Sequence, residues 1–85
     1  MSNIELIEMA YPDVLFKKMD GFDDCVVGVV ERFGQEPCLA YDRAKIIKKM
    51  VERHGMTESE AMEFYEYNQL GAYVGSTTPA FIVFI

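Results

Sequence analysis

The chain has 85 residues, a net charge of −6 and an isoelectric point near 4.6. This length is that of one small domain, residues 1–85, and a hydrophobic content of 51% with six Phe and five Tyr excludes a disordered segment. Because an acidic chain repels phosphate backbones, direct binding of nucleic acid is not expected.

The first segment, residues 3–19, is expected to be helical but interrupted. Pro12 has no backbone N–H and disfavours helix at the residue before it. We therefore expect one short helix before Pro12 and a second helix that begins near it. The second helix buries an apolar face made of Val14, Leu15, Phe16 and Met19.

Residues 20–34 are ambiguous between a helix and a strand. Four β-branched valines favour a strand, whereas the apolar residues also recur at helical spacing. Asp20 suits a helix start and Gly34 a helix end. We interpret the segment as a helix and keep the strand as the alternative for residues 22–33.

Two apolar runs are expected to form the sheet. Residues 37–41 fit a buried strand, and the β-branched and aromatic run at 80–84 is too apolar to remain exposed. Their pairing produces a two-stranded sheet covered by helices. The fold class that follows is a small, helix-rich α+β domain.

Residues 42–70 indicate two amphipathic helices joined by a glycine turn. Asp42 caps the first helix, over residues 43–54, and Gly55 closes it in a left-handed conformation. This helix carries five of the eight basic residues of the chain. Its predicted apolar face consists of Ala44, Ile47, Met50 and Val51, with Ile46 at the edge.

The second of these helices is acidic. Thr57 and Glu60 match a capping box, and the helix is expected to run to about Leu70, before an irregular turn at 71–79. It carries four carboxylates and no basic residue: Glu58, Glu60, Glu63 and Glu66. A helix-turn-helix DNA reader is therefore not expected, since its second helix would face phosphate with glutamates.

Catalytic and metal-binding residues are not recognisable in the sequence. The single histidine, His54, suits a helix C-terminus, and the two cysteines, Cys25 and Cys38, are interpreted as buried free thiols. We therefore expect no enzyme activity, no cofactor and no metal. Without an apolar run long enough to cross a bilayer, the protein is expected to be soluble and cytoplasmic.

Aromatic residues on the acidic helix exceed what one buried stripe can hold. Phe64, Tyr65, Tyr67 and Tyr73 cover more than one helix face, so at least one of them is expected at the surface. Tyrosines beside carboxylates are typical of interface anchors. Asn68 is expected to be buried and to hold the turn at 75–79, and a recognition contact with a partner is the alternative.

Three stretches resemble a family of small, acidic, mostly uncharacterised bacteriophage and prophage proteins. They are GFDDCVVGVVERFGQEP, LAYDR and MTESEAMEFYEYNQLGAYVGSTTPAFI, which together span about residues 20–82. The resemblance implies a phage-associated origin. It implies no activity and no functional residue.

The leading functional expectation is a non-enzymatic interaction protein whose partner is a host or phage protein. An inhibitor of a host enzyme or defence complex, in the manner of an anti-CRISPR protein, would dock its acidic helix into a basic groove. Asp20, Asp23 and Asp24 could extend that acidic surface. The alternative is a self-associating structural or accessory phage protein, a homodimer paired through the apolar strand at 80–84. The candidate partner-binding residues are Glu58, Glu60, Glu63, Glu66, Tyr65 and Tyr67.

Overall fold

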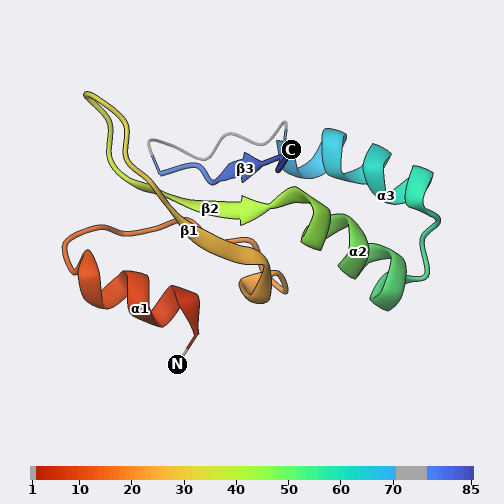
Figure 1. Cartoon of the computed structure of the whole chain (residues 1–85), viewed down its shortest axis with the longest axis horizontal. Coiled ribbons are helices and arrows are strands. Elements are labelled where there is room, and N and C mark those ends of the chain that lie inside the picture. The colour runs from red at the N-terminus through yellow and green to blue at the C-terminus, as the bar shows by residue number, and fades with distance from the viewer. Residues whose placement is uncertain (1, 71–76) are drawn as a thin grey trace.

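The computed structural model describes residues 2–70 and 77–85, and it has the predicted α+β class (Figure 1). A three-stranded sheet lies in the middle, with one helix near its N-terminal strand and a pair of helices beyond its central strand. The elements in chain order are α1 (Asn3–Ala10), the 3-10 helix η1 (Asp23–Cys25), β1 (Val26–Val30), β2 (Cys38–Asp42), α2 (Arg43–His54), α3 (Glu58–Tyr65), the π-helix η2 (Glu66–Leu70) and β3 (Ala80–Ile82).

The sheet has the strand order β1-β2-β3, so β2 is the central strand. β1 runs antiparallel to β2, with Val29 opposite Leu39, and β3 runs parallel to β2, with Phe81 beside Tyr41. The first four residues of β2 are buried, as expected for a strand that is paired on both edges. The predicted pairing of 37–41 with 80–84 is confirmed, although β3 is shorter and a third strand joins the sheet.

The helix predicted over residues 20–34 is wrong, and the alternative strand is correct over Val26–Val30. Its valines pair with β2, and the hairpin turn contains Gly34 at φ 72°. Phe33, one of the apolar residues of this segment at helical spacing, is fully exposed at this turn. β-branched side chains pack well on the pleated surface of a sheet, and in the hairpin the valines of β1 are buried or half-buried. This packing decides for the strand although the same residues also recur at helical spacing.

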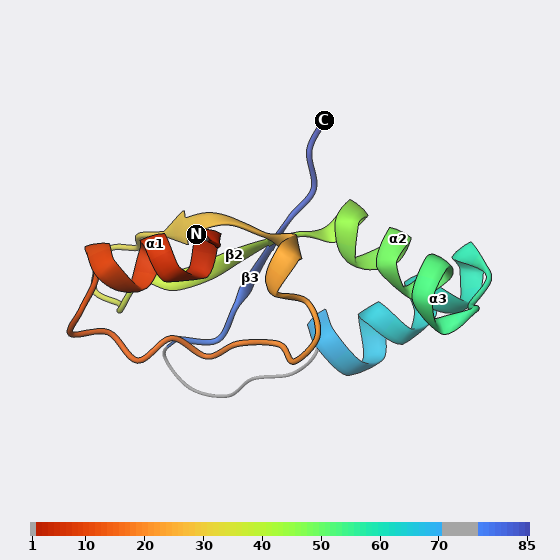
Figure 2. The same ribbon diagram turned by 90° about the horizontal axis from the view of Figure 1, so that it is seen from below.

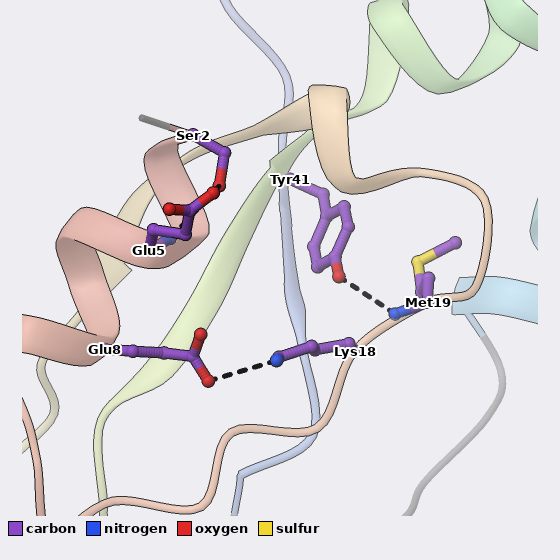
Figure 3. Close-up of polar contacts among 6 residues, drawn as sticks. All are labelled: Ser2, Glu5, Glu8, Lys18, Met19 and Tyr41. Atoms are coloured by element: carbon purple, nitrogen blue, oxygen red, sulfur yellow. Dashed lines mark hydrogen bonds and ion pairs between the residues drawn. The ribbon is translucent and has the colours of Figure 1, made fainter.

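The N-terminal segment forms one helix rather than two. α1 ends before Pro12, as predicted, but residues 14–19 form a loop in which Leu15 is exposed. Figure 3 shows how tertiary contacts hold this loop: the Met19 N–H donates to the Tyr41 hydroxyl at 2.9 Å, and Lys18 pairs with Glu8 at 3.1 Å. A helix over residues 14–19 would be too short to be stable unless one of its faces packed against the core. The tertiary contacts shown in Figure 3 hold this segment in place as a loop instead.

α2 begins and ends where the sequence predicts. The Asp42 carboxylate accepts the N–H groups of Ala44 and Lys45, and Gly55 has a left-handed φ of 66°. The buried face differs, because Ile46 and Met50 are fully buried while Ala44 is exposed. Ile46 was expected only at the edge of this face. α2 follows β2 directly along the chain, and Ile46 and Met50 lie in the same core cluster as β2, with Ile47 and Val51 partly buried against it (Figure 1).

α3 returns beside α2, and both views show the two helices next to one another (Figures 1 and 2). The predicted capping box is present: the Thr57 hydroxyl accepts the Glu60 N–H at 3.1 Å, and the Glu60 carboxylate accepts the Thr57 N–H at 3.0 Å. The expected helix to Leu70 is continuous, but it changes from α to π geometry at Glu66.

Replacing Thr57 by alanine should lower the free energy of unfolding by about 1 kcal/mol, because the first turn of α3 loses its hydroxyl acceptor. Urea denaturation followed by circular dichroism measures the change. Ser59→Ala is the matched control, since Ser59 is an exposed hydroxyl in the same turn. Equal destabilisation by the two variants would contradict the capping role.

The end of the C-terminal apolar run is exposed, contrary to the sequence expectation. Val83 and Phe84 retain 52% and 65% of their accessible surface. The reason is the parallel register, in which Ile82 lies beside Asp42, the last residue of β2. Because the chain turns into α2 at that point, β2 offers no further residue for 83 and 84 to pair with.

Candidate protein-binding surface

The α3–η2 helix presents its carboxylates to solvent. Ala61 and Tyr65 are buried against the core, and Glu58, Glu60, Glu63 and Glu66 are all exposed. Within residues 2–70 and 77–85, no ion pair joins these glutamates to the neighbouring basic helix α2. The acidic helix therefore faces outward, as the sequence predicts.

Tyr65, one of the predicted partner-binding residues, is buried in the core and does not lie on the exposed face of this helix. Its ring packs edge-on against Phe81 of β3, with 5.3 Å between the ring centroids. Burial raises the pKa of the Tyr65 phenol above its usual value. This contact instead ties the acidic helix to the sheet.

Tyr67 and Phe64 are the exposed aromatic residues of this helix. They retain 78% and 42% of their accessible surface, which confirms that at least one aromatic lies at the surface. Tyr73 lies outside the described residues. With four neighbours the two rings line a shallow depression of about 330 Å³, which we call the acidic-aromatic surface: Met56, Glu60, Glu63, Phe64, Tyr67 and Asn68.

Met56 was not anticipated in the acidic-aromatic surface, and Asn68 was expected in a recognition contact only as the alternative to a buried amide. Asn68 is exposed, and its amide donates to the Phe64 carbonyl at 3.2 Å, so the expected buried amide is wrong. Met56 precedes the N-cap residue Thr57, a position where an apolar side chain often packs onto the first turns of a helix. That position was the only sequence signal for Met56.

Glu60 differs from the other glutamates because its carboxylate is already engaged. The hydrogen bond from the Thr57 backbone N–H favours the charged form and lowers the pKa of Glu60. Glu58, Glu63 and Glu66 have no such role in the part of the chain that the structure describes. They are therefore the carboxylates most available to a partner.

Asp23 and Asp24 do not extend the acidic-aromatic surface. Asp24 pairs with Lys49 of α2 at 2.6 Å, and Lys49 also lies over the Phe22 ring at 5.6 Å from its centroid. The hydrogen bond from Lys49 lowers the pKa of Asp24. Asp23 and Asp24 line a depression together with Lys49 and Arg53, so they meet the basic helix instead of the acidic one.

The basic side of α2 is not an uninterrupted cationic groove. Its depression of about 280 Å³ contains Lys45, Lys48, Lys49 and Arg53, but also two carboxylates. Lys49 is paired with Asp24, and Lys48 lies 3.9 Å from Glu52. Two of the four cations therefore have an internal counter-charge, which weakens any attraction for a phosphate backbone.

Both cysteines are buried free thiols, as predicted. Burial raises the pKa of Cys25, which disfavours the nucleophilic thiolate. Across residues 2–70 and 77–85, no three His, Cys, Asp or Glu side chains gather closely enough to hold a metal ion. The helices described here are also too short or too polar to cross a membrane.

Comparisons with family models, curated proteins and solved structures find no match to this chain.

Proposed function

We propose that this protein is a non-enzymatic interaction protein that binds a basic surface of another protein through the acidic-aromatic surface. The observation that carries the proposal is the exposure of Tyr67 and Phe64 directly beside Glu63. A solvated acidic helix does not need aromatic side chains on its outer face. Aromatic anchors surrounded by charge are typical of protein interfaces.

The two kinds of side chain have separate roles in this proposal. Tyr67 and Phe64 supply the apolar surface that is buried on binding, and the Tyr67 hydroxyl can form a hydrogen bond at the edge of the interface. Glu63 and Glu66, together with the net charge of −6, attract a basic partner and reject an acidic one. Affinity should therefore depend mainly on the rings, and the association rate mainly on the carboxylates and on salt.

The resemblance to phage proteins suggests the nature of the partner. A host enzyme or defence complex that binds nucleic acid has a basic groove. Carboxylates spaced along a helix can occupy such a groove by imitating the charge of phosphates. In this proposal the protein competes with nucleic acid for its target and does not bind nucleic acid itself.

Affinity purification from host lysate, followed by mass spectrometry, tests the proposal with matched variants. We expect Tyr67→Ala and the pair Glu63→Lys and Glu66→Lys each to reduce recovery of a specific partner about tenfold or more. Asp13→Lys is the control, because it changes charge at an exposed loop position away from α3. Equal recovery with all three proteins would remove this surface from consideration.

A further inference from the structure

The outer edge of the sheet at β3 differs from the edge at β1. β3 is the last strand in the order β1-β2-β3, and its pairing within the described residues is to β2 alone. The apolar chain continues past it with Val83 and Phe84 exposed, and Figure 2 shows this segment projecting away from the sheet and helices. An outer strand presents unpaired backbone N–H and C=O groups to any strand that approaches.

The β1 edge carries features that protect sheets against such pairing. The register between β1 and β2 shifts between Val26 and Gly28, which interrupts a regular edge. α1 lies beside β1, and the Asn3 amide donates to the Val26 carbonyl at 2.7 Å, so this backbone acceptor is already occupied. Residues 80–84, AFIVF, have no charge, no proline and no such interruption.

We infer that residues 80–84 pair antiparallel with the same residues of a second copy, across a two-fold axis normal to the sheet. The occupant of a strand edge must be another strand, because only a strand supplies matching backbone groups in a row. A second copy meets this requirement without placing any charge at the junction. Two molecules that each carry −6 then make contact where neither is charged.

The side chains are complementary when the axis passes through Ile82. Phe81 then lies opposite Val83 of the second copy, and Ala80 lies opposite Phe84 of the second copy. An aromatic ring beside a β-branched residue is a favourable cross-strand pair, and a small residue opposite a large one avoids a clash. Because antiparallel partners share a face, this register keeps Phe81 on the side where it packs against Tyr65.

The resulting dimer is expected to be weak, because one strand pair buries less surface than a standard interface. It also leaves the acidic-aromatic surface free, since Glu63 and Tyr67 are not part of the β3 edge. Two copies would present that surface twice. The inference is therefore independent of the proposed function, and either can fail without the other.

Sedimentation velocity over a series of protein concentrations tests the dimer. The wild type should change reversibly from monomer to dimer, and Val83→Lys should raise the dissociation constant about tenfold or more, since a charged edge residue blocks strand pairing. Leu15→Lys, at an exposed apolar position in the loop before β1, should leave it unchanged. A wild type that stays monomeric, or equal effects of the two lysines, would overturn the inference.

Cross-linking tests the register. Under mild oxidation Ile82→Cys should form a covalent dimer, because the two copies of this residue meet at the axis within disulfide range. Phe84→Cys should not, since its two copies lie four residues apart along the paired strands. The two native thiols are buried and contribute little background. Cross-linking of Phe84→Cys and not of Ile82→Cys would rule out this register.

Discussion

Replacing Leu39 by alanine should lower the free energy of unfolding by about 2–5 kcal/mol. Leu39 is fully buried in the central strand, opposite Val29 of β1. Truncation removes its apolar contacts and leaves a cavity that strands paired on both sides cannot close. Domains of this kind have a total stability of about 5–15 kcal/mol, so this variant should lose a large fraction of its stability.

Urea denaturation measured by circular dichroism is the direct test of the Leu39 prediction. Leu15→Ala is the matched control, because it makes the same chemical change at a side chain that is 89% exposed. The control should alter stability by less than about 0.5 kcal/mol. Should Leu39→Val, which removes less volume, lower the free energy of unfolding as much as Leu39→Ala, the cavity explanation would be insufficient.

Replacing Tyr41 by phenylalanine should cost about 1–3 kcal/mol of stability, although the ring is kept. The change removes the hydroxyl that accepts the Met19 N–H at 2.9 Å, and this bond holds the loop before β1 against the sheet (Figure 3). The backbone amide protons of that loop should exchange faster with solvent in the variant than in the wild type. Tyr67→Phe, at an exposed phenol, is the control and should change neither stability nor exchange.

Tyr41 also links stability to alkaline pH. Burial raises the pKa of its phenol, so the folded protein holds this proton at pH values where the unfolded chain has released it. The Tyr41 contribution to stability is therefore complete below about pH 10 and is lost as pH rises through the raised pKa. Tyr41→Phe should weaken this alkaline loss of stability. A variant with the same dependence above pH 10 as the wild type would contradict the assignment.

The position of the acidic-aromatic surface depends on the core. Tyr65, on the inner side of the acidic helix, contacts Phe81 of β3, and Ala61 is fully buried. These contacts fix the rotation of α3 about its axis, and that rotation leaves Glu63 and Tyr67 outside. The same helix with a different inner face would expose different side chains.

The sequence by itself predicted the features that depend on a few neighbouring residues. The Asp42 cap, the Gly55 end of α2 and the Thr57–Glu60 capping box are all present, because each needs only local hydrogen bonds or one backbone angle. The exposure of the acidic helix face was also predictable, since four carboxylates on a helix without basic residues remain in water. The α+β class followed from the same local signals.

Tertiary structure alone decided the features in which two local preferences compete. The valines of β1 follow both helical and strand spacing, and pairing with β2 selects the strand. Tyr65 and Tyr67 are the same residue type on the same helix, but Tyr65 packs against Phe81 in the core and Tyr67 is exposed. Val83 is as apolar as the half-buried residues of β3 before it, yet it is exposed because β2 turns into α2 at Asp42. In each case the deciding contact joins residues far apart in the chain, and such contacts cannot be predicted from the neighbouring residues alone.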